Sequence, residues 1–242
     1  MGTGTAIGYG KAPMDSPLPL LLLPGLMCDG SVFAPQLAAF PQAQARPGWG
    51  PIASLTAMAE RALAEAPARF CLLGHSMGGR VALEMLRLAP ERVARIALVS
   101  TGIHPTAPGE AEKRHALVDL GRTQGMAALV DSWLPPMIAP GNRSAHAAPL
   151  HAMCMAQGLD AFAAQVEALL ARPATDAALA AIRVPTLVCT GALDLWSPAD
   201  QHEVIAARIA GARLEIVEGA GHFLPVERAE AFNAAIASWL AG

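Results

Sequence analysis

The sequence carries little charge and very little lysine. Charged residues fill 15% of its 242 positions, the formal net charge is −3, and Lys11 and Lys113 are its only lysines. Its arginines are spread along the chain rather than gathered in one segment. Binding to nucleic acid depends on a basic patch or stripe that neutralises phosphates. We therefore expect no nucleic-acid partner.

Paired cysteines and long apolar runs are also missing. Cys28, Cys71, Cys154 and Cys189 are scattered and form no C-x-x-C pair, which argues against a disulfide framework and against a metal site. No apolar run reaches the roughly 18 residues that a membrane span needs. The stretch from Pro17 to Cys28 is short and broken by prolines, which argues against a signal peptide. We expect a protein of the reducing cytoplasm without membrane contact.

What the chain does have is a regular alternation of apolar runs and helical segments. Short continuous apolar runs bounded by Gly, Pro or polar residues are typical of strands buried on both faces. They occur at 18–23, 69–76, 93–101, 184–191 and 212–219. Helical composition is found between or after them at 31–40, 54–66, 79–88, 199–209 and 228–240. This alternation predicts an α/β fold with a mostly parallel central sheet and helices on both faces.

One long segment interrupts the alternation. Residues 105–180 contain no convincing strand but several helical stretches, including 113–121 and 161–171. A simple crossover between parallel strands is far shorter. We predict a core formed by residues 1–104 and 181–242, with residues 105–180 inserted as a helical lid. At the other end, residues 4–11 are expected to add at most one edge strand.

The motif Gly74-His75-Ser76-Met77-Gly78 lies where a predicted strand ends and a helix begins. A serine at such a point must occupy a sharp turn, and glycines two residues away on each side remove the β-carbons that would collide there. The turn exposes the hydroxyl and leaves the backbone N–H of Met77 free at the start of the helix, where it is suited to bind an oxyanion. Ser76 is therefore the predicted nucleophile.

A nucleophilic serine needs a base, and the base needs an orienting acid. His222 follows the last predicted strand in a glycine-flanked loop, and Asp194 follows the strand at 184–191. Carboxyl ends of parallel strands meet at one edge of a sheet, so both side chains are expected near Ser76. Asp200 is expected inside the next helix, and residues 101–105 contain no carboxylate. Asp194 is thus the predicted acid by elimination.

The remaining histidines are expected to be structural. His75 adjoins Ser76, but neighbouring side chains along a strand point to opposite faces. The same expectation of a satisfied surface histidine applies to His104, His115, His146, His151 and His202.

The turn around Ser76, called a nucleophile elbow, and the order Ser76, Asp194, His222 resemble those of a lid-bearing α/β-hydrolase. The resemblance extends from about residue 19 to residue 240. Members of that family usually carry a His-Gly pair after the first buried strand, where the next N–H completes the oxyanion hole. Here Pro24 precedes Gly25, and Leu26 is the residue that would donate together with Met77.

The resemblance implies a serine hydrolase that cleaves a carboxylic ester of a small to medium, largely apolar small molecule, without metal or organic cofactor. Trp133, Met137 and Met153 are candidates to line an apolar acyl pocket, although methionines at such spacing are more often ordinary helix packing. Arg114, Arg122 and Arg143 are expected to be solvated surface charges rather than ligands of a substrate carboxylate.

Several alternatives share this scaffold, and thioester hydrolysis and acyl transfer to an alcohol are variants of the same chemistry. Carbon–carbon bond hydrolases and enol-lactonases of the family use the same three residues. A non-catalytic protein that binds a small ligand can also retain them.

Overall fold

A computed structural model describes residues 17–242, apart from the side chains of residues 176 and 177. The edge strand expected at residues 4–11 lies outside the described residues. Within this range the strands form one sheet in the order β2-β1-β3-β4-β5-β6, and every strand runs parallel to its neighbours. The strands are β1 (Leu20–Leu23), β2 (Ala43–Ala45), β3 (Phe70–His75), β4 (Val93–Val99), β5 (Thr186–Gly191) and β6 (Arg213–Val217). The predicted fold class is confirmed.

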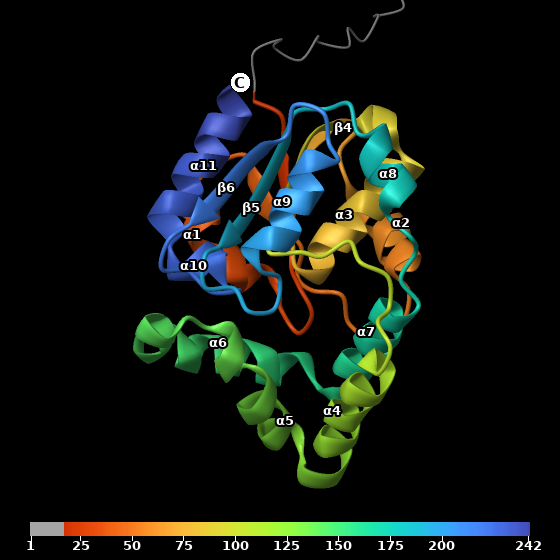
Figure 1. Ribbon diagram of the computed structural model, residues 1–242, viewed down its shortest axis with the longest axis vertical. Coiled ribbons are helices and arrows are strands. Elements are labelled where there is room, and N and C mark those ends of the chain that lie inside the picture. The colour runs from red at the N-terminus through yellow and green to blue at the C-terminus, as the bar shows by residue number, and fades with distance from the viewer. Residues whose placement is uncertain (1–16) are drawn as a thin grey trace, which may run out of the picture.

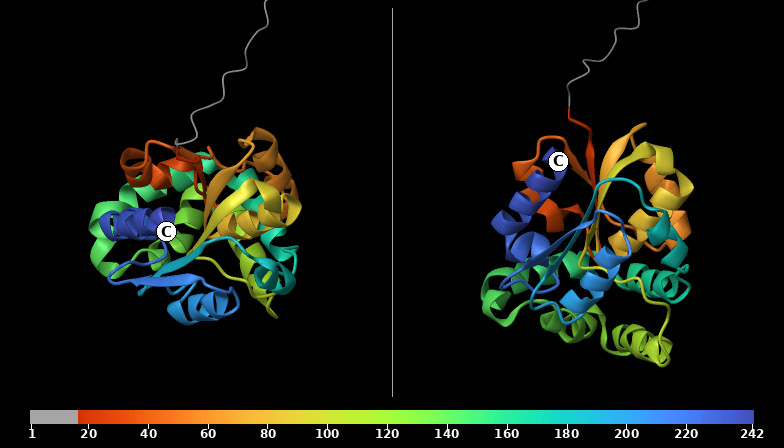
Figure 2. Two further views of the ribbon diagram at one scale, coloured as in Figure 1. Left: turned by 90° about the horizontal axis from the view of Figure 1, so that it is seen from above. Right: turned by 45° about the horizontal axis from the view of Figure 1, so that its top comes forward.

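Helices cover both faces of the sheet (Figures 1 and 2). On one face lie α1 (Ala34–Ala39) and α11 (Ala229–Ala241), and on the other lie α2 (Leu55–Glu65), α3 (Met77–Leu88) and α9 (Ala199–Ala207). Because both faces are covered, the residues of β1, β3 and β5 are buried throughout, which is why these strands appear in the sequence as continuous apolar runs.

Two elements differ from the prediction. The strand β2 was not predicted because Ala-Gln-Ala has no β-branched or aromatic residue, and only its pairing with β1 makes it a strand. The helix expected from Ser31 begins instead as a 3₁₀ turn over Gly30–Phe33, which is capped by the side chain of Asp29. Its α-helical part, α1, starts with Ala34-Pro35, where proline is well tolerated.

Between β4 and β5, residues 100–185 are all placed and form helices without a strand. These helices are α4 (Glu110–Gln124), α5 (Met126–Trp133), α6 (Arg143–Gln157), α7 (Leu159–Leu170) and α8 (Asp176–Ala181). In Figure 1, α4 to α7 lie together on one side of the sheet, beyond the strand ends, whereas α8 lies beside α3. None of the helices within residues 17–242 combines the length and hydropathy required to cross a bilayer.

Candidate active site

Ser76 lies in the sharp turn between β3 and α3 and has φ 55° and ψ −121°, a left-handed backbone that L-residues rarely adopt. The backbone around the turn leaves no room for a side chain at the flanking glycines. A β-carbon on Gly74 would lie 2.3 Å from the carbonyl oxygen of Gly78, and one on Gly78 would lie 2.2 Å from that of Leu23. No larger residue fits at either position, so the motif fixes a strained turn that presents the serine hydroxyl.

The end of β4 holds this turn in place. The N–H of Ser76 donates to the carbonyl of Val99 over 2.8 Å, and the hydroxyl of Thr101 donates to the carbonyl of Ser76 over 2.7 Å. A β-carbon on Gly79 would lie 2.7 Å from the Thr101 side chain, so Gly79 allows the close approach of α3 to the residues that follow β4. The strained backbone of Ser76 is therefore held by hydrogen bonds at both its N–H and its carbonyl.

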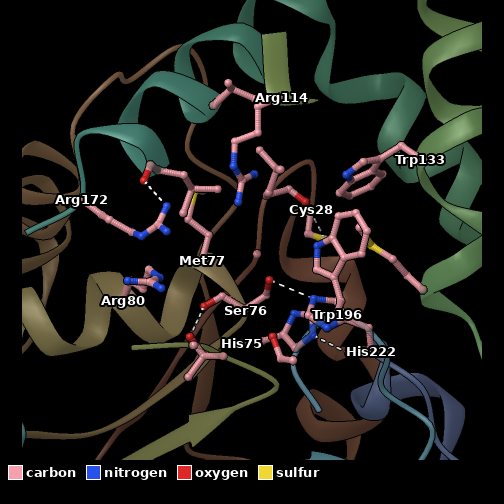
Figure 3. A pocket seen from close by; sticks show the side chains of 18 of the residues that line it. Cys28, His75, Ser76, Met77, Arg80, Arg114, Trp133, Arg172, Trp196 and His222 are labelled. Carbon is pink, nitrogen blue, oxygen red and sulfur yellow. Dashed lines mark hydrogen bonds between the residues drawn. The ribbon is translucent and has the colours of Figure 1, made fainter. Parts of the chain in front are cut away.

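His222 joins Ser76 to Asp194 in one hydrogen-bonded chain (Figure 3). Its Nε2 lies 2.9 Å from Ser76 Oγ, and its Nδ1 lies 2.9 Å from Asp194 Oδ2. An ionised carboxylate only accepts hydrogen bonds, so Nδ1 carries the proton and Nε2 is free to accept from the hydroxyl. The geometry unites the three residues that the sequence predicted as nucleophile, base and acid.

Asp194 is buried in the turn after β5 and remains ionised. Burial alone would raise the pKa of its carboxyl, but the attraction and hydrogen bond of His222, together with two backbone donors, lower that pKa to about 2. Its Oδ1 accepts from the N–H groups of Trp196 and Ser197 over 2.9 and 2.8 Å, and the Thr190 hydroxyl donates to its Oδ2 over 3.3 Å. The competing Asp200 lies in the first turn of α9, as expected.

The inserted segment supports the loop that carries His222, which lies between β6 and α10 (Leu224–Glu227). The N–H of His222 donates to the carbonyl of Met137 over 2.8 Å. The buried carboxylate of Glu227 accepts from the N–H groups of Gly221 and Phe223 and also from the N–H of Ala139 and the side chain of Asn142. Sequence reasoning missed these contacts because Ala139 and Glu227 are 88 residues apart.

His75 has a closer relation to the site than expected. It is buried, and its Nε2–H donates to the carbonyl of His222 over 2.8 Å while the two rings lie 5.2 Å apart. Burial is the main cause that lowers the pKa of His75 to about 3, so it stays neutral. His202 is also buried, with its Nε2 accepting from the N–H of Thr101. The expectation of a surface histidine is wrong for both.

The loop after β1 passes beside Ser76. A β-carbon on Gly25 would lie 3.0 Å from Ser76 Cβ, and both Leu26 and Met77 line the cavity next to the hydroxyl. Since Met77 is the first residue of α3, its N–H has no partner within the helix.

Two side chains that the sequence did not single out hold this loop. The indole N–H of Trp49 donates to the carbonyl of Pro24 over 2.9 Å. The side-chain oxygen of Gln165, on α7, accepts from the N–H of Met27, which has φ 60°.

The hydroxyl faces a cavity of about 270 Å³ (Figure 3). Of the three candidate pocket residues, Trp133 and Met137 line it, whereas Met153 is buried in α6 and is not among the lining residues. Arg114 also lines the cavity, contrary to its expected role as a surface charge, and it is joined there by Arg80 and Arg172. Arg80 belongs to the continuous sequence Gly78-Gly79-Arg80 after the elbow, a position that could have drawn attention to it.

The part of the chain that the structure describes contains no group of three His, Cys, Asp or Glu side chains placed to hold a metal ion. The arrangement around Ser76 is instead suited to nucleophilic attack on a carbonyl carbon, which needs a base and oxyanion donors.

Comparison with known proteins places the chain in a family. The model of the alpha/beta hydrolase family matches residues 8–235, so the chain belongs to that family. It is 29% identical over 178 residues to a Caulobacter sp. (strain K31) protein named as a carbamate hydrolase, RutD. That match covers 71% of this chain and 65% of the relative, so the chain spans slightly less than two thirds of that relative's length.

Two solved structures have a closely similar fold. A thermophilic esterase from Thermogutta terrifontis, with malate bound, superposes with a TM-score of 0.82 at 25% identity, covering 93% of this chain and 89% of that one. The enol-lactonase from Burkholderia xenovorans LB400 superposes with a TM-score of 0.80 at 26% identity, covering 95% and 94%.

Proposed function

We propose that the protein is a serine hydrolase that cleaves a carboxylic ester of a small to medium molecule. The observation that carries the proposal is the chain of two 2.9 Å hydrogen bonds from Asp194 through His222 to the hydroxyl of Ser76, which stands in a strained turn at the wall of a cavity. Asp194 and His222 are buried and Ser76 is partly exposed at the cavity, and such a chain of hydrogen bonds has few purely structural reasons to form.

In the proposed reaction, Ser76 Oγ attacks the ester carbonyl while His222 Nε2 takes its proton. The backbone N–H groups of Met77 and Leu26 stabilise the oxyanion that forms. His222 then gives its proton to the departing alcohol, which leaves an acyl group on Ser76. Water attacks this acyl-enzyme, with His222 again as base, and releases the acid. Asp194 stabilises the imidazolium in both steps.

We further propose that residues 105–180 act as a lid, with α4 to α7 as its covering part. Trp133, Phe162 and Met137 come from this segment and line the cavity. Their apolar surfaces suit an acyl chain or another apolar portion of the substrate. The four cysteines are buried free thiols, which supports our expectation of a reducing compartment such as the cytoplasm.

A second candidate is hydrolysis of an enol-lactone, which is an internal ester and undergoes the same attack. It is favoured by the structural likeness to the Burkholderia enol-lactonase. Hydrolysis of a carbon–carbon bond and ligand binding without turnover stay as alternatives, because both use the same scaffold.

The test is an initial-rate series on p-nitrophenyl esters of increasing acyl length, with the wild type, Ser76→Ala and a matched control. Ser132→Ala serves as the control because Ser132 is exposed on α5. We expect activity to peak at one acyl length, to fall by about 10⁴-fold or more in Ser76→Ala, and to persist in Ser132→Ala. Full activity in Ser76→Ala would overturn the nucleophile assignment.

Labelling with a fluorophosphonate separates the remaining outcomes. If Ser76 is labelled but no ester is hydrolysed, the serine is reactive and its substrate is not a simple ester. Lactone, carbon–carbon substrates and simple ligand binding would then be tested next.

A further inference from the structure

The cavity has a strongly basic side that the proposed ester chemistry does not require. Among the described residues that line it, Glu110 is the only acid, against Arg80, Lys113, Arg114 and Arg172. Figure 3 shows Arg80, Arg114 and Arg172 grouped on the side of Ser76 away from Trp133 and Trp196. These side chains come from α3, α4 and the residues after α7, so the tertiary structure alone brings them together.

Arg172 and Glu110 form a completed pair. The Nη1 and Nη2 groups of Arg172 donate to the two oxygens of Glu110 over 2.7 and 2.6 Å, and its remaining hydrogen bonds go to backbone carbonyls, including that of His104. Glu110 also accepts from Nε of Arg114 over 2.8 Å. Burial opposes ionisation of Glu110, but the hydrogen bonds from Arg172 and Arg114 hold the pKa of its carboxyl well below the ordinary value. The single carboxylate of Glu110 thus accepts hydrogen bonds from two arginines.

Arg80 has no such partner. The residue is only 7% exposed, and its Nη2 donates to the carbonyl of His104 over 3.1 Å. Its Nη1 is buried and has no hydrogen-bond partner among the residues described. Burial lowers the pKa of Arg80 to about 9, and the positive charge of Arg172 contributes to that shift. A buried cationic donor without an acceptor is costly, and a ligand that supplies the acceptor would relieve that cost.

We propose that Arg80, with Arg114 beside it, forms a carboxylate-binding subsite, so that the substrate is an ester or lactone bearing a second, ionised carboxyl group. This inference rests on the proposed function, since it names the substrate class of that same site. Arg80 lies in the first turn of α3, which begins directly after Ser76, and both residues line the same cavity. A carboxylate has two oxygens that match the planar donors of a guanidinium. Phosphate matches the same donors, and the protection experiment below separates the two anions.

The experiment compares two esters that differ only in charge. The anionic probe is the mono-p-nitrophenyl ester of adipic acid, and the neutral probe is the same compound with its free acid methylated. We expect the wild type to prefer the anionic probe by about 10-fold or more in kcat/KM. Arg80→Met should lose about 10- to 100-fold on the anionic probe and lose clearly less on the neutral one, so that the preference for the anionic probe disappears. Arg80→Lys should recover part of the loss because it restores the charge.

Arg122→Met is the matched control, since Arg122 is exposed on α4 and pairs with Asp119 away from the cavity that Ser76 faces. It should behave as the wild type with both probes. If Arg80→Met fails to fold, Arg114→Met and Arg80→Lys test the same prediction with smaller expected losses. Equal treatment of both probes by the wild type, or an equal loss on both in Arg80→Met, would overturn the subsite.

A second readout does not depend on turnover. Adipate should slow the labelling of Ser76 by a fluorophosphonate in the wild type but not in Arg80→Met. If neither ester is hydrolysed while adipate still protects through Arg80, the ester function fails and the carboxylate subsite stands. If inorganic phosphate protects better than adipate, or if neither protects, the carboxylate assignment is wrong.

Discussion

Two charged side chains, Asp194 and Arg80, lie near Ser76. The protein supplies the hydrogen-bond partners of Asp194 but leaves one nitrogen of Arg80 without an acceptor among the described residues. Asp194 accepts hydrogen bonds from His222, from two backbone N–H groups and from the hydroxyl of Thr190. Arg80, on the other side, has a buried Nη1 without an acceptor among the described residues. Both groups are buried, so the difference does not come from solvent.

This difference is the one expected between a group that takes part in catalysis and a group that binds a ligand. Groups that must be in place before a substrate arrives gain from being fixed by the protein itself. A group that recognises a ligand needs a free donor, and the ligand then supplies what the protein omits. Substitution of Asp194, and then of the residues that hold the loops around it, tests this difference.

The largest effect is expected from Asp194→Asn. An amide at this position no longer holds the His222 proton on Nδ1, so Nε2 cannot serve as base, and we expect kcat to fall by about 10³- to 10⁴-fold. Initial rates on the best p-nitrophenyl ester measure this. Asp200→Asn, in the first turn of α9, is the control and should keep full activity. A silent Asp194→Asn would mean that another carboxylate orients the histidine.

Glu227→Ala tests whether the inserted segment must be tied to the His222 loop. The change removes the acceptor of two donors in the loop and two in the segment around Ala139, so we expect about 10- to 100-fold lower kcat and a loss of about 3 kcal/mol in the free energy of unfolding. Urea unfolding and initial rates are measured together. Glu230→Ala, exposed at the start of α11, should change neither. Normal activity with reduced stability would assign Glu227 a purely structural role.

Gln165→Leu removes the acceptor that holds the N–H of Met27 and with it the loop that carries Leu26. We expect kcat to fall by about 10-fold with little change in KM, because a misplaced oxyanion donor acts on the transition state. The exposed Gln124→Leu on α4 is the comparison variant. A rise in KM at constant kcat would instead place Gln165 in substrate binding.

The last prediction concerns the pH dependence of stability and His75, where turnover is not the quantity measured. Its pKa is about 3 in the folded protein against an ordinary 6.5, so between these values the unfolded chain binds a proton that the folded chain rejects. The contribution of neutral His75 to the free energy of unfolding is therefore fully present above pH 6.5. It is lost as the pH falls toward 3, by of order 1 kcal/mol per pH unit. Buried His202, whose pKa is also lowered by burial, adds a loss of the same sign.

Urea unfolding midpoints at pH 7 and pH 4.5 measure this dependence, and Asp194, with its pKa of about 2, contributes mainly below pH 4. His75→Gln keeps a donor for the His222 carbonyl but does not titrate, so its stability should fall less steeply over this range. Ser132→Ala, at an exposed and non-titrating position on α5, should retain the wild-type slope. An unchanged slope in His75→Gln would exclude His75 as a source of acid sensitivity.

How far the sequence predicts the site depends on distance along the chain. The turn at Ser76 is partly local: a β-carbon on Gly74 would collide with Gly78 four residues later, whereas Gly78 must also clear the carbonyl of Leu23 in the neighbouring strand. Asp194 and His222 are distant, but each follows a strand of a parallel sheet, so the fold class alone brings them to one edge. Gln165 and Met27 are 138 residues apart and share no such rule.

The sequence by itself therefore determined five of the six described strands, the motif that forms the turn at Ser76 and the residues that follow the neighbouring strands, because apolar runs and closely spaced glycines are patterns along the chain. Only the tertiary structure decided which side chains brace these groups and which charge stays unpaired. Glu227 and Gln165 have ordinary sequence contexts, and their roles arise from contacts between the segment that follows β4 and the strand-end loops. His75 and Arg80 adjoin the serine motif, but only the structure shows what each contacts. A buried hydrogen bond depends on position and angle in space, and no pattern along the chain records either.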